Sequence, residues 1–363
     1  MENKIQKLIE KYGVKNFLFT NKTETFYLTG AAFDGFWILV LNGDIHIICS
    51  KMIENQAANF FGGKYKIIAG APFSKIVVET CKSATAAAAI KEIVIDTKYT
   101  SASDFLQLES KFKSESIALS KASSKALNIA FTAKTGVLDD LRIVKSASEI
   151  DNLKQACRIV SEVYDEIRAE VKAGMTELDI HYKILEMFAK RKVDPSFAPI
   201  VAAGANSANP HHASSSYKIA ENDAVMIDMG CFYKGYASDL TRTFYLGKIN
   251  EEFNKVWNTV KEAQKAVISA VKAGLPLSLA DKTARDIIDS YGYKDNFIHT
   301  TGHGVGIEIH EMPSLAINAE GIFLAGMTVT IEPGIYINNK FGVRIEDTIL
   351  VKDNGCEVLT ERQ

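Results

Sequence analysis

Two long amphipathic stretches that end in the same four residues dominate the second part of this sequence. Apolar residues recur at alternating spacings of three and four over 150–171 and again over 253–271, and this spacing places one apolar stripe along a helix. Both stretches end in Val-Lys-Ala-Gly, one hundred residues apart, and each is followed by a shorter helical stretch and by strands that contain acidic residues. The repeated order predicts that residues 148–363 form one domain of two related halves, each built as helix, helix and strands.

The first part of the chain has a different pattern, in which short apolar strands alternate with helical stretches. Strands are expected at 14–20, 24–30 and 35–41. Asn42 and Gly43 predict a tight hairpin turn into the next strand, because both residues tolerate a positive φ. This mixture predicts an α/β domain.

The change of pattern sets the expected domain boundaries. Residues 1–122 form the α/β domain, a Ser-, Ala- and Lys-rich stretch at 123–147 is the linker, and residues 148–363 form the second domain. His46, the only histidine of the first domain, lies in an apolar strand, where we expect a structural role. Five of the seven histidines lie between positions 211 and 310, so any chemistry is expected in the second domain.

Charge and hydropathy exclude several classes of protein. Lys and Arg number 42 and Asp and Glu 44, a net charge of −2, so the clustered positive charge of a nucleic-acid-binding protein is missing. No apolar run approaches the roughly 18 residues of a membrane span, and the charged N-terminus lacks the apolar core of a signal peptide. Five scattered cysteines without metal-ligand spacing are typical of reduced thiols. We therefore expect a cytoplasmic protein with no nucleic-acid and no membrane partner.

Two aspartates lie on one predicted hairpin of the first half. Asp228 interrupts an apolar strand, where an ionised carboxylate is costly unless it is paired or bound to a metal. A two-residue turn at Lys234 and Gly235 places Asp239 opposite Gly230, which shares a face with Asp228. The two aspartates are then diagonal neighbours within reach of one ion. For this pair alone, the alternative is a locally hydrogen-bonded Asp228 beside a solvated Asp239.

The second half repeats this arrangement with glutamates. Glu332 ends an apolar strand, and a three-residue loop centred on Asn339 places it directly opposite Glu346. Arg344 shares a face with Glu346, because side chains alternate along a strand. Four converging carboxylates repel one another strongly unless cations lie between them. The pattern therefore predicts a site for two divalent ions.

His303 completes a set of five metal ligands. It lies between Gly302 and Gly304 on an expected loop, where its ring can point freely. Oxygen and nitrogen ligands without cysteine suit Mn²⁺, Fe²⁺ or Co²⁺ better than a structural zinc ion. The glycine spacing is no dinucleotide-binding fingerprint, because it does not join a strand to a helix.

Five ordered strings of the second domain carry a resemblance to a known family. They are PHH at 210–212, IDMG to YASDLTRTF at 227–244, GHGVGIEIHEMP at 302–313, TIEPGIYI at 330–337 and VRIED at 343–347. Together they resemble the pita-bread metallopeptidases, which include aminopeptidase P, prolidase and methionine aminopeptidase. The resemblance covers roughly residues 125–363 and implies an α+β catalytic domain with a pseudo-twofold repeat. The preceding α/β domain is similar to the N-terminal domain of aminopeptidase P, prolidase and creatinase.

The resemblance also assigns roles to individual residues. The family's metal ligands match Asp228, Asp239, His303, Glu332 and Glu346. Its substrate-contacting histidines match His211 and His310, and the residues that line the side holding proline match His299 and Arg344. His212 is the alternative to His211, because adjacent residues of an extended segment point opposite ways.

The function implied by the resemblance is that of a homodimeric exopeptidase that hydrolyses Xaa-Pro bonds, as an aminopeptidase P or a prolidase. Two metal ions, Mn²⁺ in the first place and Co²⁺, Fe²⁺ or Zn²⁺ otherwise, would share a water molecule and supply hydroxide. Glu332 would pass a proton to the proline nitrogen, while His211 and His310 would hydrogen-bond the substrate and the oxyanion. The rivals are a metal-free creatinase-like amidinohydrolase, a non-catalytic binding scaffold and a methionine aminopeptidase. The five ligands disfavour the first two, and the extra N-terminal domain disfavours the third.

Overall fold

The structure, a computed structural model, describes residues 1–85, 90–121 and 129–360. It divides into two compact units, Met1–Leu141 and Arg142–Gln363. Among the described residues, no helix combines the length and the apolar character that a membrane crossing needs.

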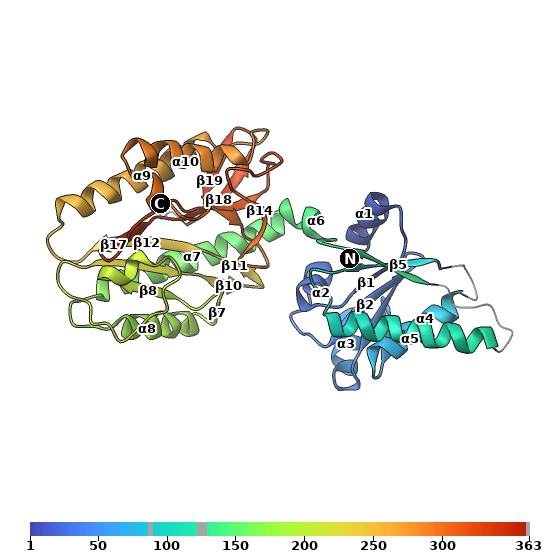
Figure 1. Cartoon of the computed structure of the whole chain (residues 1–363). Helices are drawn as coiled ribbons and strands as arrows, with labels where there is room; N and C mark the ends of the chain where they lie inside the picture. The colour runs from blue at the N-terminus through green and yellow to red at the C-terminus, as the bar shows by residue number, and fades with distance from the viewer. Residues whose placement is uncertain (86–89, 122–128, 361–363) are drawn as a thin grey trace. The chain divides into compact units, whose positions relative to one another are not determined.

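The first unit is an α/β domain built on a six-stranded sheet in the order β4-β3-β2-β1-β5-β6 (Figure 1). Its strands are β1 (Phe17–Phe19), β2 (Phe36–Leu41), β3 (Asp44–Cys49), β4 (Lys66–Ala69), β5 (Glu92–Asp96) and β6 (Ala130–Lys134). Its helices are α1 (Glu2–Tyr12), α2 (Lys22–Thr29), α3 (Glu54–Phe61), α4 (Phe73–Thr85) and α5 (Ala102–Lys121). The expected hairpin is confirmed: Leu41 pairs with Asp44, and φ is 52° at Asn42 and 91° at Gly43.

Residues 24–29 are helical and Gly30 caps the helix end, so the prediction of a strand at 24–30 is wrong. The helix is α2, which begins with a capping box. The Asn21 side chain accepts a hydrogen bond from the Thr23 N–H (2.8 Å), and the Glu24 carboxylate accepts one from the Asn21 N–H (3.1 Å). These caps satisfy N–H groups that a helix end leaves free, and they outweigh the strand preference of the aromatic residues.

Part of the segment expected as a linker belongs to the first sheet. β6 pairs in parallel with β5, and its Phe131 packs against Phe105 and Phe112 of α5. Residues 122–128, which the linker and the end of the first domain were expected to share, lie outside the described residues. A short helix, α6 (Asp139–Ile143), follows β6, and the first long helix of the second unit begins at Ala147.

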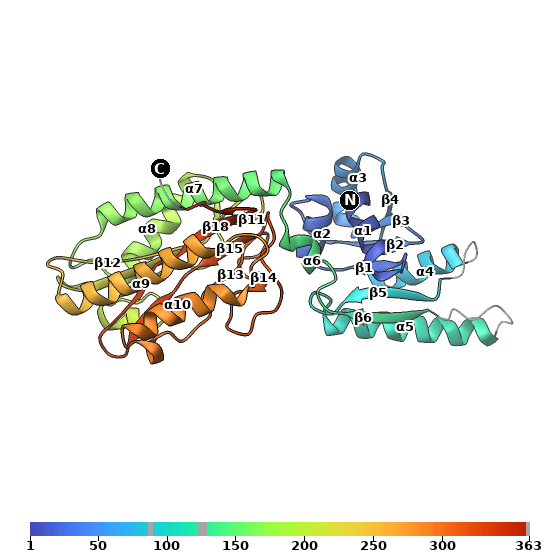
Figure 2. The ribbon, with the colours of Figure 1, turned by 90° about the horizontal axis from the view of Figure 1, so that it is seen from above.

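The second unit consists of two halves in the expected order. In the first half, α7 (Ala147–Glu170) and α8 (Glu177–Lys190) pack on a sheet of β8 (Ile200–Ala203), β9 (Ala224–Met229) and β12 (Leu240–Tyr245). In the second half, α9 (Glu251–Ala270) and α10 (Ser278–Ser290) pack on the sheet β14-β13-β15-β18-β19. α9 and α10 lie side by side in both views (Figure 1, Figure 2).

The strands of the second sheet are β13 (His303–Gly304), β14 (Glu311–Ser314), β15 (Thr328–Ile331), β18 (Asp347–Lys352) and β19 (Gly355–Val358). The remaining strands of the second unit form two small sheets. One consists of β11 (Tyr236–Ala237), β10 (Cys231–Tyr233) and β7 (Asp194–Pro195), and the other of β16 (Gly334–Ile337) and β17 (Phe341–Arg344). Each half has a large apolar core, and smaller apolar clusters join the halves, as where Cys157 packs against Leu350 and Leu359. The first core includes Val160, Ile184 and Ile227, and the second includes Val260, Val329 and Ile349.

Both predicted hairpin registers are confirmed. In the first half, Thr241 pairs with Asp228 and Leu240 pairs with Met229. The same register, continued by one residue, places Asp239 opposite Gly230. The turn residues have positive φ, 48° at Lys234 and 82° at Gly235. In the second half, Ile331 pairs with Asp347 and Gly334 with Arg344, so that Glu332 lies opposite Glu346. Turn chemistry thus determines which carboxylates face each other.

Candidate metal centre

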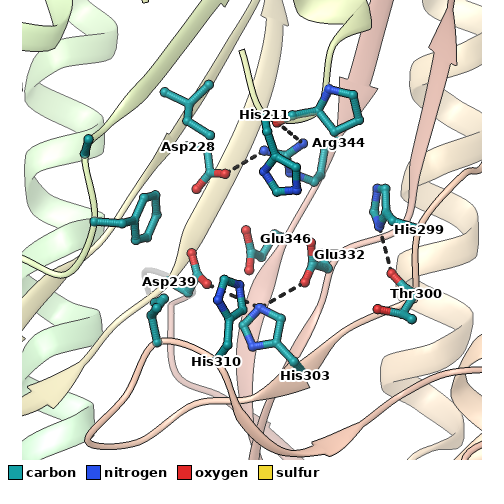
Figure 3. A pocket seen from close by; sticks show the side chains of 15 residues that line it. His211, Asp228, Asp239, His299, Thr300, His303, His310, Glu332, Arg344 and Glu346 are labelled. Carbon is teal, nitrogen blue, oxygen red and sulfur yellow. Dashed lines mark hydrogen bonds and ion pairs between the residues drawn. The ribbon is translucent and has the colours of Figure 1, made fainter. Parts of the chain in front are cut away.

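The nine residues expected above to hold the metals or to contact the substrate all line one cavity of about 520 Å³ in the second unit (Figure 3). They are His211, Asp228, Asp239, His299, His303, His310, Glu332, Arg344 and Glu346. Their segments come from both halves of the unit. The cavity therefore brings together side chains that lie up to 135 positions apart in the sequence.

The five candidate ligands lie on strands or directly at strand ends. Asp228 is in β9, Asp239 precedes β12, His303 is in β13, Glu332 follows β15 and Glu346 precedes β18. His303 Nε2 lies 3.2 Å from Glu332 Oε1 and 3.6 Å from Asp239 Oδ2. Ligand atoms of Asp239, His303 and Glu346 all lie within 4.8 Å of one another. This spacing suits side chains that share a cation.

The glycines beside His303 allow close packing of strands and not, as expected, a free loop. They do not free the ring on a loop, because His303 lies in β13, between β14 and β15. A Cβ at Gly302 would come within 2.0 Å of the Thr330 carbonyl oxygen, and one at Gly304 within 2.3 Å of the Met312 carbonyl oxygen. The glycines let three strands approach closely enough to hold His303 against the carboxylates.

Burial and mutual repulsion perturb the carboxylates. Burial, and then the charge of Glu346, raises the pKa of Asp239 well above its ordinary value. Burial, and then the charge of Glu332, raises the pKa of Glu346 well above its ordinary value. Burial also raises the pKa of Asp228, although the Arg344 guanidinium opposes this. A divalent cation among these groups would relieve both the desolvation and the repulsion.

Two buried oxygens test directly whether a metal fits. Within the described part of the chain, no group donates a hydrogen bond to Asp228 Oδ1 or to Glu346 Oε1. The second oxygen of each carboxylate is satisfied, Asp228 Oδ2 by Arg344 (2.6 Å) and Glu346 Oε2 by the Thr241 hydroxyl (2.6 Å). Buried polar atoms normally have a partner, and carboxylate oxygens with an imidazole nitrogen are a donor set for divalent metals. The residues therefore fit divalent metal ions.

Thr241 is a site residue that the sequence reasoning missed. Its hydroxyl accepts a hydrogen bond from Arg344 Nε (3.1 Å) and donates one to Glu346 Oε2. A guanidinium can only donate, so the single hydroxyl hydrogen must point to Glu346. The only available signal was the position of Thr241 directly opposite Asp228 in the predicted register, on the same face as Asp239.

Tyr336 is a second missed residue, although it lies in the string TIEPGIYI. Its hydroxyl lies 2.9 Å from His299 Nε2 and accepts a hydrogen bond from Arg344 Nη1 (2.8 Å). His299 Nδ1 lies 2.8 Å from the Thr300 carbonyl oxygen, which makes Nδ1 the donor and Nε2 the acceptor. Burial raises the pKa of Tyr336 to about 12, so its hydroxyl keeps the hydrogen that it donates to His299.

Three further histidines, His310, His211 and His212, differ in their surroundings. The ring of His310 lies 4.3 Å from that of His303, with an interplanar angle of 69°, so the two rings stand side by side in Figure 3. His211 lines the cavity, whereas Nε2 of His212 lies 2.8 Å from the buried carboxylate of Glu177. This placement agrees with the preference for His211 over His212, and its contact with substrate stays a prediction.

Comparison with known proteins defines the class. A profile of metallopeptidase family M24 matches residues 151–353, more than half of the chain, and a profile of the creatinase/prolidase N-terminal domain matches residues 3–144. The chain therefore belongs to metallopeptidase family M24. Membership in a metallopeptidase family implies divalent metal ions, in agreement with the donor set of the cavity.

Individual relatives and solved structures agree with this class. The chain is 41% identical over 228 residues to an Xaa-Pro dipeptidase of Pyrococcus furiosus. The match spans 62% of this chain and 66% of that relative, so the chain covers just under two thirds of the relative's length. It is similar to the structure of an Xaa-Pro dipeptidase from Bacillus anthracis, with a TM-score of 0.90, 31% identity and coverage of 99% and 98% of the two chains. It is also similar to an X-Pro aminopeptidase from Thermotoga maritima, with a TM-score of 0.85, 29% identity and 98% coverage of both chains.

Proposed function

We propose that this protein is a two-metal exopeptidase that hydrolyses Xaa-Pro peptide bonds. The observation that carries the proposal is the meeting of four carboxylates and His303 in a cavity that three further histidines line. The names of the related proteins, two Xaa-Pro dipeptidases and an X-Pro aminopeptidase, support the choice of the bond.

The residues of the cavity divide the work. The ions would be held by Asp228, Asp239, His303, Glu332 and Glu346. When bound, such ions lower the pKa of a coordinated water and polarise a carbonyl oxygen. Glu332 would accept a proton from the attacking water and deliver it to the departing proline nitrogen. His211 and His310, which line the same cavity, would donate hydrogen bonds to the substrate oxygen on which negative charge grows.

Specificity for proline would come from the wall formed by His299 and Arg344. Proline nitrogen carries no hydrogen and its ring fixes φ, so an enzyme for this bond needs a pocket shaped for the ring. Tyr336 holds His299 in one orientation and tautomer, which gives this wall a defined shape. We further propose Mn²⁺ as the ion, because four of the five ligands are carboxylates. We propose a homodimer as the working form, as the family resemblance implies, and a cytoplasmic location, which the scattered cysteines favour.

The experiment is hydrolysis of Ala-Pro beside Ala-Pro-Ala, with Ala-Ala-Ala as the control peptide. The protein is stripped by a chelator, assayed, and assayed again after Mn²⁺ is added. Cleavage of Ala-Pro alone would define a dipeptidase, and cleavage of Ala-Pro-Ala an aminopeptidase. Failure to cleave either proline peptide with Mn²⁺ bound would refute the proposal, as would full activity in the stripped protein. Release of urea from creatine would favour the amidinohydrolase instead.

A further inference from the structure

One buried carboxylate outside the metal centre collects hydrogen bonds from the segment that carries His211. Glu177, the first residue of α8, has 0% of its surface exposed. Its Oε1 accepts from the Ala203 N–H (2.8 Å) and from Asn206 Nδ2 (3.0 Å). Its Oε2 accepts from the Ser215 N–H (2.9 Å), the Ser215 hydroxyl (2.7 Å) and His212 Nε2 (2.8 Å). One side chain thus joins both ends of the segment 203–215.

The start of α8 holds the same segment through its main chain. The first N–H groups of a helix have no partner within the helix. Here the Glu177 N–H donates to the Tyr217 carbonyl (3.1 Å), and the Leu178 N–H donates to the Ser215 carbonyl (3.1 Å). Burial alone favours a neutral acid, yet the hydrogen bonds from Ser215, Asn206 and His212 lower the pKa of Glu177. Glu177 is therefore an ionised acceptor, and all the hydrogen-bond donors to its carboxylate lie in the segment 203–215.

His211 lies between two neighbours that hydrogen bonds hold in place. On one side, the Pro210 carbonyl accepts a hydrogen bond from Arg344 Nη1 (3.3 Å). On the other side, the His212 ring is bonded to Glu177. His211 itself is exposed toward the cavity, so its position depends on the backbone that its two neighbours hold.

We propose that Glu177 is a positioning residue for His211, acting through His212 and Ser215. The inference rests on the proposed function, in which His211 contacts the substrate. Glu177 touches neither the cavity nor a candidate metal ligand, so its effect reaches the reaction only through the loop. A shift of about 1 Å in a positioned group can lower a rate on the order of 10²-fold.

Glu177→Gln is the sharpest variant. The glutamine amide can be turned in two ways. In one its NH₂ group faces the Ala203 N–H, and in the other it faces the Ser215 N–H. Either way two donors face each other, because a main-chain N–H cannot accept a hydrogen bond. The matched control is Asp179→Asn, the same chemical change two positions along α8. Asp179 is exposed and caps only the helix, accepting from the Thr176 N–H (2.8 Å).

The experiment measures kcat and KM for the proline peptide that the wild type cleaves, together with Mn²⁺ content and melting temperature. We expect Glu177→Gln to lower kcat/KM about 10- to 100-fold. The fall should be distributed over kcat and KM in the same proportion as in His211→Ala. The Mn²⁺ content should equal that of the wild type. Asp179→Asn should stay within about twofold of the wild type. In the double variant Glu177→Gln/His211→Ala the two effects should not add, because both act through one side chain.

A lowered melting temperature with wild-type kcat/KM in Glu177→Gln, or additive effects in the double variant, would overturn the inference. If Glu177→Gln does not fold, Ser215→Ala replaces it, since this variant removes one donor and keeps the Ser215 N–H. If the wild type cleaves no proline peptide, the proposed function fails, and amide hydrogen exchange decides the inference separately. Faster exchange at 203–215 in Glu177→Gln but not in Asp179→Asn supports the anchor, and unchanged exchange refutes it.

Discussion

Thr241→Val would test whether a single hydroxyl sets the geometry of the metal centre. Thr241 is fully buried in β12, and valine has the same shape without the hydroxyl. The change leaves the Arg344 Nε–H without its acceptor and Glu346 Oε2 without its donor. Both carboxylate oxygens of Glu346 would then lack a fixed partner, and the side chain could turn away from the cavity.

The expected loss of metal affinity in Thr241→Val is large enough to measure. Removing a group that orients a metal ligand typically weakens metal binding 10- to 100-fold, or about 1.4–2.8 kcal/mol at about 1.4 kcal/mol per tenfold. Isothermal titration of the chelator-stripped protein with Mn²⁺ would give the affinity directly. Thr241→Ser, which keeps the hydroxyl, should restore most of it.

Thr243→Val is the matched control for this experiment. Thr243 is buried in the same strand and on the same face, but its hydroxyl bonds the main chain of Arg344, donating to the carbonyl (2.9 Å) and accepting from the N–H (3.1 Å). We expect it to cost about 1–3 kcal/mol of unfolding free energy with little change in Mn²⁺ affinity. Equal Mn²⁺ affinities in Thr241→Val and the wild type would show that the hydroxyl does not orient Glu346.

Three further substitutions probe the other parts of the site. Asp239→Ala should fold but lose at least one metal ion and nearly all turnover; wild-type metal content with a wild-type rate would remove Asp239 from the ligand set. His310→Ala should keep its metal and lose turnover by about 10²–10³, the range for one oxyanion donor, whereas a lowered melting temperature with an unchanged kcat would mark a core residue. Tyr336→Phe should raise KM for a proline peptide, because His299 loses its hydrogen-bond donor. The expected rise is about tenfold, which corresponds to the free energy of one hydrogen bond. An unchanged KM in a peptidase assay would contradict this.

The carboxylate pairs could be predicted because local chemistry determines them. Lys234 and Gly235 adopt the positive φ that a two-residue turn needs, and the turn fixes the register of every residue behind it. Asn339, with φ of 59°, does the same for the second hairpin. Since side chains alternate along a strand, the register alone decides which acids share a face.

The supporting residues could not be predicted, because their partners are remote in sequence. Thr241 and Glu346 are 105 positions apart, and Glu177 reaches residues 26 and 38 positions away. Nothing in the local pattern of Thr241 distinguishes it from Thr243, two positions away in the same strand. Helix α2 differs from the prediction for the opposite reason, because a local feature, the cap at Asn21, outweighs the apolar strand pattern.

The candidate metal ligands are divided between the two halves of the second unit, so a bound ion would link the halves. Asp228 and Asp239 come from the half with one apolar core, while His303, Glu332 and Glu346 come from the half with the other. The halves already share apolar contacts, such as Cys157 of α7 with Leu350 and Leu359. An ion held by both sets would add a further link between them, and its binding free energy would add to the free energy of unfolding by mass action. In a cell short of that metal the protein would be easier to unfold as well as inactive, so its lifetime, and not only its rate, would follow the metal supply.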